Sequence, residues 1–271
     1  MPAADQELPP APSRFEGRTA IVTGGGTGIG LSIVERLARE GAEVMLVGPD
    51  MGILEDAVKS LPVGSGTAHP HCADLVDPAQ INGVAEDALS RWPKIDVLVN
   101  CAGTDKDSLF FEMDLADWNH IMAVNLTAPF LLSQRLAPHM IAERQGAIVN
   151  IGSIAALGAD GPFACYSASK AGLIAFTRSI SIELASHGVR ANVVSPGVTH
   201  TNSLGWSPEQ LDHMLTSFAR VPLGRLLERR EIADTVAFLA SDEASGITGS
   251  NVIVDGGLTA NLYLVETLPD E

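Results

Sequence analysis

Tyr166 and Lys170 are the residues whose types and spacing most directly suggest chemistry. They lie near the start of an expected helix at 164–187, and a separation of four positions places both side chains on one helical face. A free phenol has a pKa of about 10, and a neighbouring ammonium favours the phenolate and so lowers that pKa. The pair could therefore exchange a proton with the oxygen of a carbonyl or an alcohol, although surface helices often contain the same spacing without such a role.

Two further polar residues could join this pair. Ser153 follows an expected strand at 146–151, where its hydroxyl could hydrogen-bond a substrate oxygen as the charge on that oxygen changes. Asn125 lies in the middle of an expected helix at 115–143, although Asn is a mediocre helix former. The alternative for Asn125 is a polar side chain that faces solvent.

A glycine-rich segment at 24–30 follows the first expected strand and opens a helix. Glycine lacks a Cβ, so the backbone can turn sharply and approach a ligand closely. The amides at the start of the helix would then face a pyrophosphate. The spacing is not Gly-x-Gly-x-x-Gly and no Lys-Ser/Thr pair follows, which disfavours a nucleoside triphosphate loop. The alternative is an ordinary glycine-rich turn.

Short aliphatic runs alternate with helical stretches along the chain, and this alternation predicts the elements that position these residues. Strands separated by helix-length crossovers predict an α/β fold: a Rossmann-like, doubly wound, mainly parallel seven-stranded sheet with helices on both faces. Ligands bind outside the carboxyl ends of the strands in such sheets. The expected strands are 19–23, 43–47, 68–73, 95–100, 146–151, 190–195 and 251–254, and the expected helices are 28–40, 51–60, 78–91, 115–143, 164–187, 207–219 and 230–240.

The chain of 271 residues is long enough for one large domain with a sizeable core. Residues 1–14 have no periodicity and predict a disordered N-terminal arm. We expect residues 15–257 to form a single dinucleotide-binding domain that also holds the candidate catalytic residues, and residues 258–271 to form a C-terminal tail. The net charge of −16 disfavours nucleic acid and anionic membranes as partners. No apolar run approaches the ~20 residues of a membrane span, and the acidic N-terminus does not resemble a secretory signal.

The cysteines and histidines do not suggest a metal site. Cys72, Cys101 and Cys165 are widely spaced, which predicts reduced thiols in a cytoplasmic protein. His69 and His71 alternate on an expected strand and share a face, but no third ligand is evident near them. We therefore expect no metal.

The order of these motifs resembles the short-chain dehydrogenase/reductase family. The resemblance covers about Gly17 to Gly257 and starts with Thr-Gly-x-x-x-Gly-x-Gly after the first strand. It implies a catalytic tetrad, in which the Asn holds a relay water, the Ser orients the substrate oxygen, the Tyr is the acid–base group, and the Lys lowers the Tyr pKa and contacts the nicotinamide ribose. The matching residues are Asn125, Ser153, Tyr166 and Lys170.

The same resemblance implies a set of cofactor contacts. Cys101 departs from the family pattern, which usually has Asn at this position before Ala-Gly. The implied contacts are Gly24, Thr27, Gly28, Ile29, Gly30, Asp50, Asp74, Leu75, Asn100, Ala102, Gly103, Tyr166, Lys170, Pro196, Gly197 and Thr201.

The residues that close the second strand bear on the choice of cofactor. Gly48 stands where NAD-using members usually carry Asp, and Pro49 stands where many NADP-using members carry Arg. Thr27 is not basic, and Asp50 follows shortly after. Because burying a phosphate without a cation is costly, NAD is favoured and NADP is the alternative.

The resemblance implies an oxidoreductase that transfers a hydride between a nicotinamide cofactor and a small secondary alcohol or ketone. The alternatives are a non-catalytic, regulatory NAD(P)-binding module and an NAD-dependent epimerase or dehydratase. The latter relatives usually have another glycine spacing and a longer C-terminal domain than this chain. Relatives commonly form homotetramers through the helices that contain Asn125 and Tyr166 and through the last helix and strand, so a homo-oligomer, specifically a tetramer, is expected.

Overall fold

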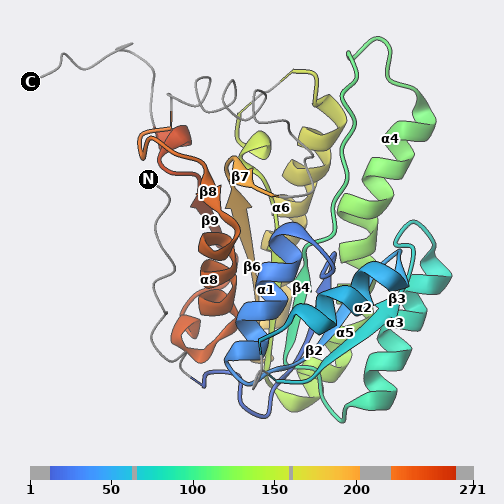
Figure 1. Cartoon of the computed structure of the whole chain (residues 1–271), viewed down its shortest axis with the longest axis vertical. Helices are drawn as coiled ribbons and strands as arrows, with labels where there is room; N and C mark the ends of the chain where they lie inside the picture. Colours follow the sequence, from blue (N-terminus) through green and yellow to red (C-terminus); the bar gives the residue numbers. More distant parts are fainter. Residues whose placement is uncertain (1–12, 63–65, 159–160, 202–220, 261–271) are drawn as a thin grey trace, which may run out of the picture.

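The computed structural model describes residues 13–62, 66–158, 161–201 and 221–260. Its centre is a seven-stranded sheet in the order β3-β2-β1-β4-β5-β6-β9, and all neighbouring strands are parallel (Figure 1). This confirms the predicted doubly wound α/β fold. The strands are β1 (Thr19–Thr23), β2 (Glu43–Gly48), β3 (Ala68–Cys72), β4 (Val97–Asn100), β5 (Gly146–Ile151), β6 (Val189–Pro196) and β9 (Asn251–Val254). The α-helices are α1 (Gly28–Arg39), α2 (Met51–Ser60), α3 (Pro78–Arg91), α4 (Leu115–Met122), α5 (Ala128–Glu143), α6 (Ala164–Ala185) and α8 (Arg229–Ala240).

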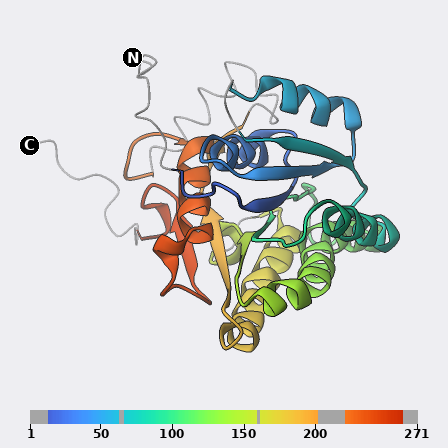
Figure 2. The ribbon, with the colours of Figure 1, turned by 90° about the horizontal axis from the view of Figure 1, so that it is seen from below.

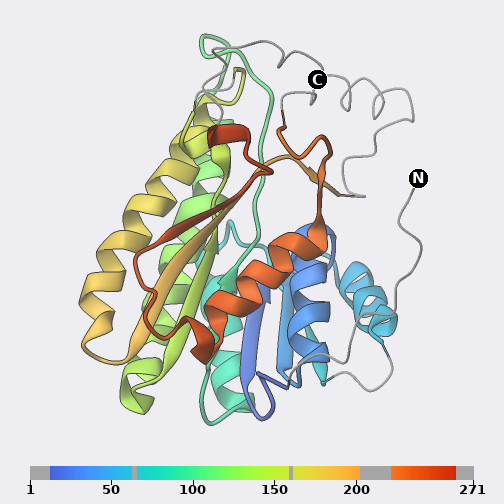
Figure 3. The same cartoon turned by 90° about the vertical axis from the view of Figure 1, so that its left-hand side faces the viewer.

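Two helical layers cover the sheet because its central strands are apolar on both faces. Successive residues of β1 alternate between the layers: Ala20 and Val22 pack with α1, α2 and α8, whereas Ile21 packs with α3, α5 and α6. Figure 2 shows both layers from below, and Figure 3 shows α8 beside α1 across one face. Among the described residues, no helix combines the length and the apolar character needed to cross a membrane.

The predicted element boundaries lie within two residues of the observed ones, apart from the helix at 115–143. The strand expected at 95–100 begins at Val97, and the helix expected at 164–187 ends at Ala185. A small second sheet was not predicted: β7 (Thr199–His200) pairs with β8 (Leu227–Glu228). The helix expected at 207–219 lies outside the described residues.

The helix expected at 115–143 is broken, contrary to the prediction. Between α4 and α5 the chain makes a π-helical turn at Ala123–Thr127, and Pro129 stands in the first turn of α5. Proline has no N–H, so Pro129 cannot donate to the carbonyl of Asn125, its i−4 partner. Inserting one residue into the turn is a known solution at such places and often marks a functional site. The π-turn buries Asn125 completely, so the alternative of a solvent-facing side chain is wrong.

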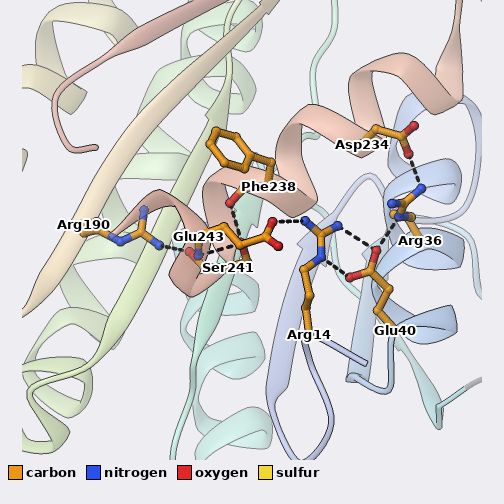
Figure 4. A network of polar contacts seen from close by, with 8 residues as sticks. All are labelled: Arg14, Arg36, Glu40, Arg190, Asp234, Phe238, Ser241 and Glu243. Atoms are coloured by element: carbon orange, nitrogen blue, oxygen red, sulfur yellow. Dashed lines mark hydrogen bonds and ion pairs between the residues drawn. The ribbon is translucent and has the colours of Figure 1, made fainter. Parts of the chain in front are cut away.

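Arg14 is bound to the folded domain, although residues 1–14 were expected to form a disordered arm. Its guanidinium donates to both carboxylate oxygens of Glu40, at 2.5 Å from Nε and 2.7 Å from Nη2, and to Glu243 at 2.8 Å (Figure 4). The physical reason is a buried acceptor: the Glu40 side chain is 0% exposed and needs a cation. The domain therefore includes Arg14, and residues 1–12 of the expected arm lie outside the described residues.

Glu40 also joins α1 to α8 through a second arginine. Arg36 donates to Glu40 at 2.6 Å and to Asp234 of α8 at 2.6 Å (Figure 4). Nearby, Arg190 donates to the carbonyl oxygen of Ser241 at 2.9 Å and so satisfies an acceptor at the end of α8. These polar contacts hold α8 in place against one face of the sheet.

We expect Glu40→Gln to lower the free energy of unfolding by about 3 kcal/mol, the low end for a broken buried ion pair, because Arg14 and Arg36 keep other partners. Urea unfolding at neutral pH measures this change. Glu243→Gln is the matched control: its carboxylate is 58% exposed, so the loss should stay below about 1 kcal/mol. Equal losses in the two variants would contradict the importance of the buried carboxylate.

Candidate active site

One cleft lies at the carboxyl ends of the four central strands. Residues that directly follow β1, β4 and β5, together with the end of β6, enclose a cavity of about 510 Å³. These strand ends point toward the top of the molecule in Figure 1. The position is the one that a parallel, doubly wound sheet offers to a ligand.

Most residues predicted from the sequence line this cleft together. They are Gly24, Thr27, Gly28, Ile29, Gly30, Ala102, Gly103, Ser153, Tyr166, Lys170, Pro196, Gly197 and Thr201. Five predicted residues do not line it: Asp50, Asp74, Leu75, Asn100 and Asn125. Six lining residues were not predicted: Cys101, Thr104, Asp105, Ile151, Gly152 and Thr199. All six lie within five residues of the end of a strand that reaches the cleft. Their closeness to these strand ends is the sequence feature from which they could have been predicted.

Lys170 is buried beneath the cleft and is held by the backbone. Its Nζ donates to the carbonyl oxygen of Ile151 at 2.8 Å and lies 5.7 Å from the centroid of the Tyr166 ring. Burial lowers the pKa of Lys170 to about 8. At neutral pH the amine is therefore mostly protonated but close to its titration range.

The Tyr166 phenol has a different electrostatic setting from the one expected. Burial raises the pKa of Tyr166, and a hydrogen bond with Ser153 opposes that rise. The ammonium of Lys170 was expected to lower this pKa, but its hydrogen bond goes to Ile151 and it lies beside the ring. In the structure, Ser153 is thus the neighbour that favours the phenolate.

Ser153 is oriented for this contact. Its Oγ accepts a hydrogen bond from the N–H of Ala155 at 3.1 Å and caps the short 3₁₀ turn Ile154–Ala156. With the oxygen used as an acceptor, the hydroxyl proton can be donated toward Tyr166. Local capping therefore sets the direction of the Ser153 hydroxyl.

Asn125 acts as a clamp rather than as part of the cleft wall. Its Oδ1 accepts from the N–H of Thr104 at 2.9 Å, and its Nδ2 donates to the carbonyl oxygen of Thr104 at 2.8 Å and to Ser169 Oγ at 3.0 Å. Ser169 in turn donates to the carbonyl oxygen of Tyr166 at 2.7 Å. Asn125 thereby ties the segment after β4 to the helix that carries Tyr166 and Lys170.

The glycine-rich loop fits a pyrophosphate group. Gly24 has a φ of +68°, and a Cβ on it would lie 2.9 Å from Ala102 Cα. A Cβ on Gly30 would lie 2.0 Å from the carbonyl oxygen of Gly24, so the loop requires glycine there. Thr27, the N-cap of α1, makes no side-chain capping bond, so the first N–H groups of α1 are available to an anion.

The residues expected at the adenosine end of a dinucleotide play other roles within the protein. Asp50 accepts from the N–H of Ile53 at 3.1 Å and caps α2, and Asp74 accepts from the N–H of Val76 at 2.9 Å. Both are exposed. Leu75 is packed in the core at 7% exposure. Their contacts with a cofactor stay predictions.

Asn100 supports the cleft from below. It is buried, and its Nδ2 donates to Asn150 Oδ1 at 2.7 Å, which links the ends of β4 and β5. Thr23 Oγ1 accepts from the N–H groups of Cys101 and Ala102 at 3.0 and 3.1 Å and links β1 to the same turn. These side chains position the loops and leave the backbone of the loops to face the cavity.

The sequence and the fold of this chain are similar to those of known proteins. A family model described as enoyl-(acyl carrier protein) reductase matches residues 24–259. The chain is 37% identical over 245 residues to the 3-oxoacyl-[acyl-carrier-protein] reductase FabG of Thermotoga maritima, covering 90% of this chain and 99% of the relative. It is 39% identical over 246 residues to the FabG of Escherichia coli, covering 90% and 98%. A solved structure titled short chain dehydrogenase/reductase family protein has a TM-score of 0.81 and 38% identity, covering 91% of this chain and 99% of that one.

Proposed function

The chain belongs to the short-chain dehydrogenase/reductase family and is an NAD(P)-dependent oxidoreductase acting on alcohols and ketones, and from this premise we propose that Tyr166 is its acid–base group. The supporting observation is that Tyr166, Ser153 and Lys170 line one cleft together with the glycine loop. The substrate is proposed to be a small molecule that alternates between a ketone and a secondary alcohol.

The glycine loop 24–30 and Lys170 would hold a nicotinamide cofactor, which would supply the hydride for reduction of the ketone and accept it in oxidation of the alcohol. In reduction, Tyr166 donates its hydroxyl proton to the developing alkoxide, which becomes the alcohol, and is left as a phenolate. In oxidation, the phenolate takes the alcohol proton back. Ser153 stabilises both oxygens in turn by donating its own hydroxyl hydrogen bond.

Lys170 and Asn125 have supporting roles in this proposal. Lys170, with its pKa lowered to about 8 by burial, can pass a proton toward Tyr166 near neutral pH and can hold a ribose hydroxyl. The side-chain amide of Asn125 is hydrogen-bonded to Thr104 and Ser169. A relay water would therefore bind the main-chain carbonyl oxygen of Asn125. That carbonyl lacks the usual i+4 donor because residue 129 is proline.

NAD is the proposed preferred cofactor, and NADP is the alternative. The loop 24–27 and the segment 48–51 lie at the carboxyl ends of β1 and β2 and contain no Lys or Arg. The second segment contains Asp50, which is exposed. A 2′-phosphate in this region would meet a carboxylate and no cation from these two segments. A free 2′-hydroxyl avoids that repulsion.

We also propose that the chain is a cytoplasmic homo-oligomer, as the sequence analysis expected. Ile182 on α6 is 80% exposed and Phe130 on α5 is 40% exposed. The rings of Phe130 and Phe176 of α6 pack edge-to-face with their centroids 6.1 Å apart. Both helices therefore have apolar side chains at the surface. All three cysteines are free thiols, which suits a reducing compartment.

Replacing Tyr166 with Phe should lower kcat by at least about 100-fold, because the proton donor is lost while the ring still packs. The Kd for the cofactor should change by less than about threefold, since one contact at most is removed. Absorbance at 340 nm with a panel of ketones and alcohols measures the first quantity, and calorimetry measures the second. An active Tyr166→Phe variant would refute the acid–base assignment, and a wild-type protein that binds the cofactor without net turnover would indicate a non-catalytic module or a transient-redox enzyme.

The wild-type protein should show a higher kcat/KM with NADH than with NADPH. Pro49→Arg should raise kcat/KM for NADPH about tenfold, because a charge-assisted hydrogen bond contributes about 1.5–3 kcal/mol. Pro49 is exposed, and its carbonyl, which accepts from Cys72 Sγ, is retained in the variant. Ser60→Arg adds the same charge at the far end of α2 and should leave the ratio unchanged. Preference of the wild type for NADPH would sink this assignment.

Ile182→Glu should shift the protein to a smaller assembly, because a charge would be buried at the proposed contact. Light scattering after size-exclusion chromatography measures the mass of both proteins. A wild-type monomer, or an unchanged mass in the variant, would speak against assembly through this surface.

A further inference from the structure

Asp105 is an acidic side chain in the cleft that the catalytic scheme above does not use. It lines the same cavity as Ser153, Tyr166 and Lys170. Its position is fixed by the clamp described above, because Asn125 holds both the N–H and the carbonyl of Thr104, the residue directly before it. Asp105 therefore sits at a defined place in the wall of the cleft.

The carboxylate of Asp105 is exposed and forms no direct pair with a described neighbour. Among the described residues no hydrogen bond or ion pair involves its side chain. The segment 101–114 contains one cation, Lys106, and that side chain is paired with Asp117. An anionic substrate would thus find no free cation in this segment.

The charge of Asp105 reaches both reacting groups. It raises the pKa of Tyr166 and opposes the lowering of the pKa of Lys170. The other groups that act on this pair within the described structure are the Ser153 hydroxyl and the Cys101 thiol. Burial raises the pKa of Cys101 to about 12, so the thiol is neutral at neutral pH. Asp105 is then the anionic side chain that lines the cavity together with Ser153, Tyr166 and Lys170.

The residues that follow Asp105 along the chain are also acidic or apolar. The same segment and the start of α4 expose several acidic and large apolar side chains and no unpaired cation. The acidic ones are Asp107, Glu112 and Asp114, and the apolar ones are Leu109, Phe110, Phe111 and Leu115. These carboxylates do not line the cleft and are screened by solvent, so they contribute little to the selection of substrates inside it.

We propose that Asp105 is a specificity-determining residue that selects against substrates with a negative charge close to the reacting carbonyl. The natural substrate is then a ketone or alcohol whose neighbouring groups are neutral or cationic. This inference rests on the proposed function and narrows it to a charge class. Discrimination arises from repulsion of the wrong substrate rather than from a new attractive contact with the right one.

A matched pair of substrates tests the proposal. Ethyl acetoacetate and acetoacetate have the same ketone and differ in one ester or carboxylate group. The wild-type enzyme with its reduced cofactor should favour the ester in kcat/KM by about tenfold or more, since like charges this close in a partly desolvated cleft repel by an amount of that order. Asp105→Asn should cut this preference about tenfold, and Asp105→Lys should cut it further or invert it.

Asp107→Asn is the control variant. It removes an equally exposed carboxylate two positions along the chain that does not line the cleft. Its preference for the ester should stay within about twofold of the wild type, because solvent screens that charge. A wild type that reduces both substrates equally well, or equal effects of Asp105→Asn and Asp107→Asn, would overturn the proposal.

A spectroscopic titration separates this inference from the proposed function. The chain has two tyrosines, so the phenolate absorbance of Tyr166 is obtained by subtracting the titration of Tyr166→Phe. Because the Asp105 charge raises the pKa of Tyr166, Asp105→Asn should move this titration to lower pH, and Asp107→Asn should not. If no ketone is turned over with either cofactor, the proposed function fails, while an unchanged titration in Asp105→Asn overturns the role of Asp105 by itself.

Discussion

The hydrogen bonds of Asn125 are the interaction on which the rest of the site depends. One buried amide holds the backbone of Thr104 with both of its polar ends and also binds Ser169 on the next helix. It joins the loop after β4, the π-turn and α6 into one unit. A buried amide that lost these partners would leave several polar groups unpaired, at a cost of about 1–3 kcal/mol for each group. A residue outside the cleft therefore fixes where the loop after β4 lies relative to the helix that carries Tyr166 and Lys170.

The break in the helix is what makes this clamp possible. Pro129 removes one hydrogen bond of a regular helix, and the π-turn at Ala123–Thr127 takes up the extra residue. The Asn125 side chain is completely buried within this turn. In a regular α-helix the residues that follow would be rotated to other positions around the helix axis. A backbone irregularity near a functional site is thus explained by one missing N–H group.

The electrostatics of the cleft come from burial more than from pairing. Burial lowers the pKa of Lys170 to about 8 and raises the pKa of Tyr166, so the two groups titrate in a range set by their removal from water. Ser153 then favours the phenolate, and Asp105 opposes it.

The sequence by itself determined the fold class, the order of the strands and helices along the chain and the glycine loop, because these depend on local periodicity and on motifs of fixed spacing. The Asn-Ser-Tyr-Lys set came from the family resemblance, and its role stays a proposal. Only the tertiary structure decided which groups touch. Proline at 129 is visible in the sequence, but the π-turn and the burial of Asn125 depend on packing against α6. Lys170 was expected to act on the Tyr166 hydroxyl, yet the carbonyl of Ile151, brought from another strand, takes its hydrogen bond. Asp105 and Arg14 gained their places in the same way, since contacts between residues far apart in the chain follow from the packed fold and leave no local pattern.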